Sequence, residues 1–186
     1  LEGYLFPETY KFSPMMTEEQ AIGLMVKQFN RIVDKELRLR ARQIGMSIHE
    51  VVTMASIVEG EAQVGEERSV ISAVYYNRLK RRMRLQADPT VQYVIKDGPR
   101  RLFYKDYGIE SPYNTYRHRG LPPGPIMSPG EASLRAALYP AEVDYLYFVA
   151  RGDGSHIFSR TATEHERAKR ETRRARRRTW SGTNPR

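Results

Sequence analysis

The chain has 186 residues, of which 40% are hydrophobic, and this fits one domain with a core of its own. It carries 31 Lys and Arg against 22 Asp and Glu, and it has no cysteine, which excludes disulfides, thiolate metal sites and thiol nucleophiles. No run reaches the length of about eighteen apolar residues that a membrane-spanning helix needs, and no signal peptide is recognisable.

The positive charge is concentrated at the C-terminus. Nine Lys and Arg but one acidic residue, Glu171, lie from Arg167 onward, so this segment carries +8 of the net charge of +9. A nucleic-acid-binding domain usually spreads its basic residues over a face that also reads the bases. The distribution therefore argues against nucleic acid as a partner. We expect one domain over residues 1–170, followed by a basic tail over residues 171–186.

Helical periodicity covers three segments in the first half of the chain. The first begins with a capping box at Thr17 and keeps its apolar period to about Arg42. The second runs from Ser47 to residues 59–62 and is apolar around nearly its whole circumference, which predicts a central helix. A third helix is expected over residues 66–82.

The second half of the chain combines loops with short elements. Within residues 83–127, a short helix is expected after Pro89, and two loops rich in Gly, Pro, Asn and Tyr follow it. Two apolar segments, residues 146–150 and 156–159, flank a turn sequence and predict a β-hairpin. A last helix is expected to begin at Thr163 and to fray near Arg173, because like charges repel. The predicted fold class is α+β, mostly helical, with one small antiparallel sheet.

Two carboxylates at the end of the central helix are candidates for chemistry. Glu59 follows a run of apolar residues, and burial would raise its pKa so that it holds a proton near neutral pH. Such an acid can protonate the leaving oxygen of a glycosidic bond. The spacing alone leaves open that Glu59 caps the helix or pairs with an arginine. Glu61 points away from Glu59, and we expect it to give structural support. Gly60 either admits a ligand or ends the helix.

The two loops offer polar and aromatic side chains suited to a sugar polymer. Amides bind hydroxyl and acetamido groups, and aromatic rings stack on sugar faces. Two structural alternatives stay open: Asp88 caps the helix after Pro89, and the tyrosines pack in the core. No spacing of His and carboxylates resembles a metal site, so we expect no metal and no cofactor. The candidate substrate-binding residues are Gln86, Asp88, Thr90, Asn114, Tyr116 and, in the hairpin, His156.

Long motifs of unusual composition cover nearly the whole chain. They are LEGYLFPETY (1–10), ASIVEGEA (55–62), NRL with MRLQADPTVQY (77–79, 83–93), YNTY with GLPPGPI (113–126), SPGEASLRAALYPA (128–141) and YLYFVARGDGSHIFS (145–159). In order and spacing they resemble the YceG-like family, whose members are endolytic murein transglycosylases. The resemblance extends over about residues 1–170, and it says nothing about the basic tail.

The resemblance implies a lysozyme-like catalytic domain with Glu59 as the catalytic residue and the two loops lining the cleft. The implied substrate is the glycan strand of peptidoglycan, and peptidoglycan synthases (penicillin-binding proteins) are the implied partners. The resemblance implies that the full-length protein is a single-pass inner-membrane protein in which a LysM-like module precedes the catalytic domain. The resemblance therefore implies attachment to the plasma membrane through a helix that precedes this chain, with the catalytic domain on the periplasmic or extracellular side.

The implied reaction cleaves the β-1,4 bond between N-acetylmuramic acid and N-acetylglucosamine and leaves a 1,6-anhydro-muramoyl end. Glu59 acts first as the acid and then as the base, so that no second carboxylate is required. This reaction would act in cell wall assembly by ending glycan chains. Two alternatives remain: a hydrolytic muramidase in which Glu59 pairs with Asp88 or Glu61, and a non-catalytic cell-wall-binding or nucleic-acid-binding module that uses the basic tail.

Overall fold

A computed structural model describes residues 1–96, 98 and 100–182. Within these residues the chain forms seven α-helices, two short 3-10 helices and one two-stranded antiparallel sheet, which confirms the predicted α+β class. In chain order the elements are α1 (Glu18–Ile32), α2 (Lys35–Gln43), α3 (Ile48–Glu61), η1 (Gly65–Glu67), α4 (Arg68–Lys80), α5 (Asp88–Val94), η2 (Tyr104–Gly108), α6 (Glu131–Leu138), β1 (Tyr147–Ala150), β2 (His156–Ser159) and α7 (Ala162–Gly182).

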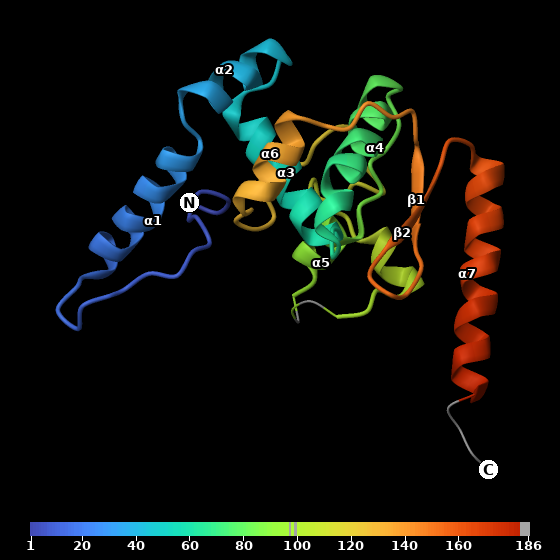
Figure 1. Ribbon diagram of the computed structural model, residues 1–186. Helices are drawn as coiled ribbons and strands as arrows, with labels where there is room; N and C mark the ends of the chain where they lie inside the picture. The colour runs from blue at the N-terminus through green and yellow to red at the C-terminus, as the bar shows by residue number, and fades with distance from the viewer. Residues whose placement is uncertain (97, 99, 183–186) are drawn as a thin grey trace.

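Helix α3 lies in the middle of the molecule and contacts α2, α4, α5 and α6 (Figure 1). Every residue from Val51 to Val58 is buried. A helix that is apolar on all sides must be enclosed by its neighbours, because any face left in water would lose the free energy gained by burial. The prediction of a central helix is confirmed. The fully buried side chains that pack with it include Ile71, Tyr75, Leu134 and Leu138.

The helix expected to continue without a break to about Arg42 is two helices. Helix α1 ends where the N–H of Val33 donates to the carbonyl of Phe29. Helix α2 then begins at Asp34, whose side chain accepts a hydrogen bond from the N–H of Leu37 at 3.0 Å. The expectation of one helix was wrong. The apolar period continues across the break and gives no sign of it, but the side chain of Asp34 caps the start of a second helix.

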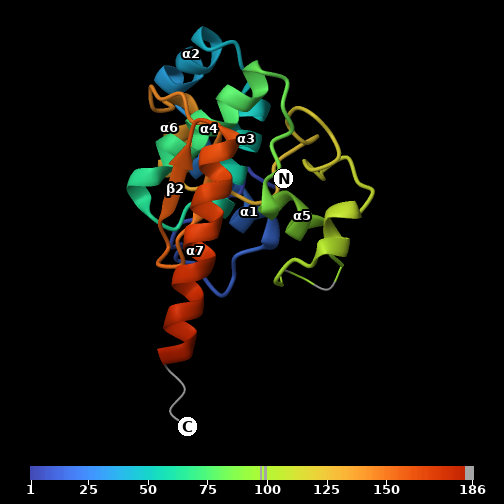
Figure 2. The ribbon, with the colours of Figure 1, turned by 90° about the vertical axis from the view of Figure 1, so that its right-hand side faces the viewer.

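The predicted hairpin is present, with Tyr147 opposite Ser159 and Ala150 opposite His156. Its strands join at a turn that contains two glycines with positive φ angles, Gly152 and Gly154. Helix α7 packs on both strands, on the side of the hairpin that faces away from α4 (Figures 1 and 2). The hairpin therefore separates the C-terminal helix from the rest of the core.

Helix α7 begins and ends at other positions than predicted. Its first turn is capped by Thr161 rather than Thr163, since the Thr161 hydroxyl accepts from the N–H of Glu164. The helix continues to Gly182, so the expected fraying near Arg173 is wrong. Burial of Ala168 and Thr172, together with helical ion pairs such as Arg167–Glu171, offsets the repulsion between the basic residues. Among the described residues, no helix has both the length and the apolar composition needed to cross a membrane.

The end of α3 packs closely on the start of α5 at Gly60. A Cβ atom at this position would lie 2.7 Å from the Cβ of Pro89 and 3.3 Å from the Cε of Met127. Gly60 does not end the helix, because α3 continues to Glu61. Pro89 occupies the space where a side chain would lie, although Gly60 itself is exposed. The glycine is therefore needed for the close approach of the two helices.

We expect the substitution Gly60→Ala to lower the free energy of unfolding by about 1–3 kcal/mol, because Pro89 has to move away from the new methyl group. Gly23→Ala in α1 is the matched control, since no atom lies within 4 Å of the Cβ position there. That variant gains about 0.5–1 kcal/mol from the better helix former. Urea unfolding of both variants measures the difference. An equal gain at both positions would contradict the close contact.

Candidate active site

Glu59 lies in the last turn of α3, between the start of α6 and the start of α4. The N–H of Gly130 donates to its Oε2 atom at 3.2 Å, and the Nη2 atom of Arg68 lies 3.7 Å from its Oε1 atom. The side chain of Glu59 is 29% exposed. Both contacts stabilise a carboxylate, and the exposed part of the side chain leaves an approach for a substrate.

The raised pKa predicted for Glu59 is found instead at Glu61, which is partly exposed as a residue. Residues two apart on an α-helix point in nearly opposite directions, so Glu61 faces the interior when Glu59 faces the surface. The hydroxyl of Tyr75 donates to Oε1 of Glu61 at 2.8 Å. Burial raises the pKa of Glu61 from the ordinary value of 4.5 to about 7, and the nearby charge of Asp88 also raises it. The sequence thus predicted an acid with a raised pKa at this helix end but placed it at the wrong carboxylate.

Asp88 connects α5 to the loop that contains Tyr116. It is the first residue of α5, but its side chain makes no capping hydrogen bond to the helix. It accepts instead from the hydroxyl of Tyr116, with an O–O distance of 2.6 Å. Burial, followed by the charge of Asp88, raises the pKa of Tyr116, so the phenol keeps the proton that it donates. The ring of Tyr116 packs on that of Tyr107, with 4.5 Å between the ring centroids.

Gln86 is the exposed member of the predicted substrate-binding set. Its φ angle is +52°, an unusual conformation for a residue other than glycine, and its N–H donates to the carbonyl of Thr115 at 3.2 Å. This hydrogen bond fixes the strained backbone to the following loop. The residue is exposed, and the Oε1 atom of its side chain accepts from Nη1 of Arg78 at 3.4 Å.

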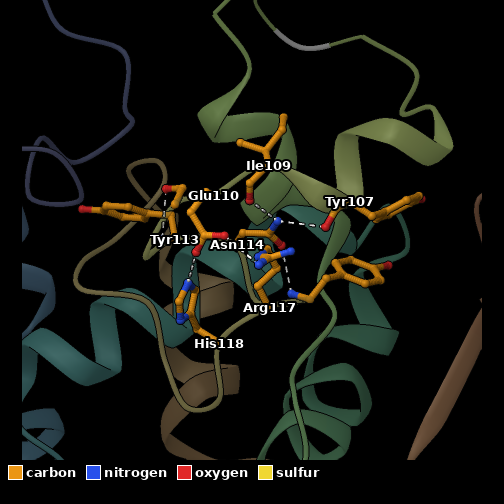
Figure 3. A network of polar contacts seen from close by, with 9 residues as sticks. Tyr107, Ile109, Glu110, Tyr113, Asn114, Arg117 and His118 are labelled. Carbon is orange, nitrogen blue, oxygen red and sulfur yellow. Dashed lines mark hydrogen bonds and ion pairs between the residues drawn. The ribbon is translucent and has the colours of Figure 1, made fainter.

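Asn114 lies at the centre of the loop that follows η2, as Figure 3 shows. Its Nδ2 atom donates to the carbonyls of Tyr107 and Ile109 at 3.1 and 2.8 Å, and its Oδ1 atom accepts from the N–H of Tyr116 at 3.0 Å. The residue is completely buried. Contrary to expectation, the Asn114 side chain does not line a cleft, because all three of these hydrogen bonds hold the loop itself.

Thr90 is also completely buried. Its hydroxyl donates to the carbonyl of Ala87 at 2.7 Å and lies 2.8 Å from the hydroxyl of Thr115. The expected substrate-facing position is therefore not found for Thr90 either. The pair of threonines joins α5 to the loop of Asn114, so that both loops form one unit.

His156 lies apart from these two loops, at the first position of β2. Its side chain is 7% exposed, and its Nδ1 atom lies 2.7 Å from Oε2 of Glu67. The N–H of His156 also donates to Glu67 at 3.0 Å. Because Glu67 directly precedes Arg68, this contact fixes the hairpin to the turn that carries the cation beside Glu59. The structure gives His156 a place in the packing rather than on a substrate-binding surface.

Sequence reasoning missed Arg68, Gly130 and Tyr75, which contact the two glutamates. Arg68 and Gly130 are ordinary helix-start residues, and Tyr75 lies at an apolar position of α4. At such positions, none of these three residues indicates a catalytic or binding role in the sequence alone. No group of three or more His, Asp or Glu able to hold a metal occurs among residues 1–96, 98 and 100–182. A surface cavity of about 710 Å³ lies elsewhere, between α2, α4 and residues 140–145, and none of the candidate residues lines it.

The sequence model of the YceG-like family matches residues 1–171. The chain belongs to the YceG-like family. This YceG-like chain is 46% identical over 170 residues to the endolytic murein transglycosylase of Bacillus subtilis strain 168, covering 91% of the chain and 47% of the relative. It is 36% identical over 176 residues to the endolytic murein transglycosylase of Streptococcus pneumoniae strain R6, covering 90% of the chain and 31% of the relative.

The fold is also that of a solved member of the family. The crystal structure of a YceG-like protein from Listeria monocytogenes superposes with a TM-score of 0.82 at 44% identity. The match covers 89% of this chain and 53% of the Listeria chain. The family resemblance found in the motifs is confirmed. The chain spans about half the length of the Bacillus relative and about a third of the Streptococcus relative.

We expect Glu61 to make the stability of the fold depend on pH. Because its pKa is about 7 in the folded chain and near 4.5 in the unfolded chain, unfolding releases a proton between these values. The contribution of protonated Glu61 to the free energy of unfolding is complete below about pH 4.5. It is lost as the pH rises through 7, and the loss amounts to roughly 3 kcal/mol.

Urea unfolding at pH 5 and pH 8 measures this loss in the wild type, and Glu61→Gln is expected to remove most of it. Glu142→Gln, at an exposed position, is the matched control and should behave as the wild type. The same pH dependence in all three proteins would show that Glu61 titrates as an ordinary surface carboxylate.

Proposed function

We propose that this protein is an endolytic murein transglycosylase in which Glu59 is the catalytic acid and base. The observation that carries the proposal is the position of Glu59, a partly exposed carboxyl group that accepts a hydrogen bond from the N–H of Gly130 and directly follows the buried part of α3. The Bacillus and Streptococcus relatives, which bear that name, support the reaction type and its substrate, the glycan strand of murein.

In the proposed reaction, neutral Glu59 gives its proton to the β-1,4 oxygen between N-acetylmuramic acid and N-acetylglucosamine. The bond from this oxygen to carbon-1 of the muramoyl residue breaks as an oxocarbenium-like state develops. The hydroxyl on carbon-6 of the same residue then attacks carbon-1, and the Glu59 carboxylate takes up its proton. The products are a 1,6-anhydro-muramoyl end and a free N-acetylglucosamine end, and Glu59 is neutral again.

The neighbours of Glu59 suit the carboxylate that exists between the two proton transfers. The N–H of Gly130 and the guanidinium of Arg68 both favour negative charge at this position. Gln86, with its exposed amide, and the rim formed by Asp88 and Tyr116 are the proposed sugar contacts. Thr90, Asn114 and His156 instead hold the surrounding segments in place.

Mass spectrometry of the products formed from polymeric glycan tests the reaction. The wild type is expected to give anhydro-muramoyl ends, which are lighter by one water than hydrolysed ends. Glu59→Gln should keep the fold and lower the rate by at least about a hundredfold, because an amide cannot give and take the proton.

Glu142 is an exposed carboxylate in the segment 140–145, which lines the cavity. The matched control Glu142→Gln should keep the wild-type rate. Reducing ends in place of anhydro ends would identify a hydrolytic muramidase. Binding without turnover, abolished by salt, would identify a binding module. A Glu59→Gln variant with wild-type turnover would remove Glu59 from the mechanism.

The location of this substrate supports a further part of the proposal. Because murein surrounds the plasma membrane on its outer side, we propose that this domain lies on that side, attached to the membrane through a segment that precedes it. Peptidoglycan synthases, which make the strands, are the proposed partners there. Protease added to intact spheroplasts or protoplasts is expected to digest the domain in the full-length protein, and protection from the protease would contradict this location.

A further inference from the structure

A polar cluster behind the candidate active site joins three helices. Glu61, at the end of α3, accepts the hydrogen bond of Tyr75 from α4 at 2.8 Å. Asp88, at the start of α5, accepts the hydrogen bond of Tyr116 at 2.6 Å. The two carboxyl groups interact with each other, and the backbone N–H of Asp88 also faces Glu61. The proton transfers proposed for Glu59 make no use of Glu61.

The positive charge of Arg78 in α4 lowers the pKa of Glu61. The guanidinium of Arg78, however, forms hydrogen bonds to backbone carbonyls. Its Nε atom donates to the carbonyl of Leu146 at 2.7 Å, and its Nη1 atom donates to the carbonyl of Leu85 at 2.6 Å. Within the described part of the chain, Arg78 forms no ion pair with Glu61 or Asp88. Two ionised carboxylates in the interior would therefore repel each other across the contact between α3 and α5.

We propose that Glu61 is a positioning residue for the reaction at Glu59. As a neutral acid beside Asp88, it holds α5 and the Tyr116 loop against the end of α3, and its ionisation loosens this contact. The inference rests on the proposed function, because it assigns Glu61 a part in the same reaction. Glu61 does not touch the substrate in this account.

The contact at Gly60 transmits the effect to Glu59. Gly60 separates the two glutamates, and Pro89 of α5 lies so close to it that no Cβ atom fits between them. A displacement of α5 therefore changes the packing of the last turn of α3, which carries Glu59. Even a small shift of this turn misplaces the proton donor, because general acid catalysis needs the Glu59 carboxyl group within hydrogen-bond distance of the leaving oxygen.

The other ionisable groups that face the pair do not change charge near neutral pH. Burial raises the pKa of Tyr75 and of Tyr116 above the ordinary value of 10.0. Tyr107, which packs on Tyr116 beside Asp88, has its pKa raised by burial as well. Burial lowers the pKa of Arg78, and a guanidinium nevertheless stays charged in this range. Glu61 is thus the member of the cluster suited to respond to pH.

The pH dependence of kcat and KM on soluble glycan oligomers, from pH 6 to pH 8, tests the proposal. Glu61→Gln keeps an acceptor for Tyr75 but cannot ionise. It is expected to retain kcat within about threefold of the wild type at pH 6, and the ratio of its kcat to that of the wild type should rise at least about fivefold by pH 8. KM should change less than kcat, because Glu61 does not itself touch the substrate.

Two further variants separate positioning from structure alone. Glu61→Ala removes the acceptor and is expected to lower kcat at least about tenfold at every pH, so that activity in Glu61→Gln represents rescue. Glu142→Gln should follow the wild-type profile. Parallel pH profiles for Glu61→Gln and the wild type would overturn the proposal. So would a Glu61→Gln variant as inactive as Glu59→Gln, which would place Glu61 in the proton transfer itself.

A measurement without turnover distinguishes this inference from the proposed function. Carboxyl carbon NMR of the wild type is expected to show Glu61 titrating near pH 7, and Asp88→Asn should shift this titration to lower pH. Titration of Glu61 in the ordinary carboxyl range would overturn the inference even if the enzyme is active. Conversely, absence of anhydro products from the wild type would contradict the proposed function and leave the titration result standing.

Discussion

The burial of the middle of α3, from Val51 to Val58, is the constraint on which the rest of the structure depends. A helix that is apolar around its circumference needs neighbours on every side, and α2, α4, α5 and α6 supply them. This enclosure gives the last turn of α3 a rigid setting. Side chains there cannot move freely, because the turn is fixed by Pro89 at Gly60 and by the N–H of Gly130 at Glu59. Precise placement of a catalytic carboxyl group follows from the packing of the helix that carries it.

The same helix end presents two carboxyl groups to two different environments. Glu59 meets an N–H donor and a guanidinium, and part of its side chain is exposed. Glu61 meets a phenol and a second carboxylate in the interior, and it retains a proton to a higher pH. Glu59 and Glu61 are residues of the same type, separated by one glycine. Because their surroundings differ, each is suited to a different role. In this view the interior glutamate supports the geometry, and the surface glutamate carries out the chemistry.

Buried polar groups give the long loops their order. Residues 109–130 contain no helix or strand, and a segment of this length would ordinarily be mobile. Asn114 replaces missing secondary structure by bonding to three backbone groups, and the pair of Thr90 and Thr115 attaches the loop to α5. Such groups are costly to bury without partners, so their complete pairing favours one conformation. The amides and hydroxyls that suggested sugar binding in the sequence serve largely to hold the loops.

Local patterns in the sequence determined most of the elements, because caps, apolar periods and turn residues act within a few positions. They predicted the central helix, the hairpin and the family, and they singled out the helix end with Glu59 and Glu61. They failed at Asp34, where a side-chain cap divides one apolar period into two helices, and at Arg173, where α7 continues beyond the buried residues Ala168 and Thr172. Only the tertiary structure decided which glutamate bonds to Tyr75 and has the raised pKa, and that Thr90, Asn114 and His156 face inward. Spacing along a helix fixes the angle between two side chains, whereas the neighbours that cover each of them come from distant parts of the chain.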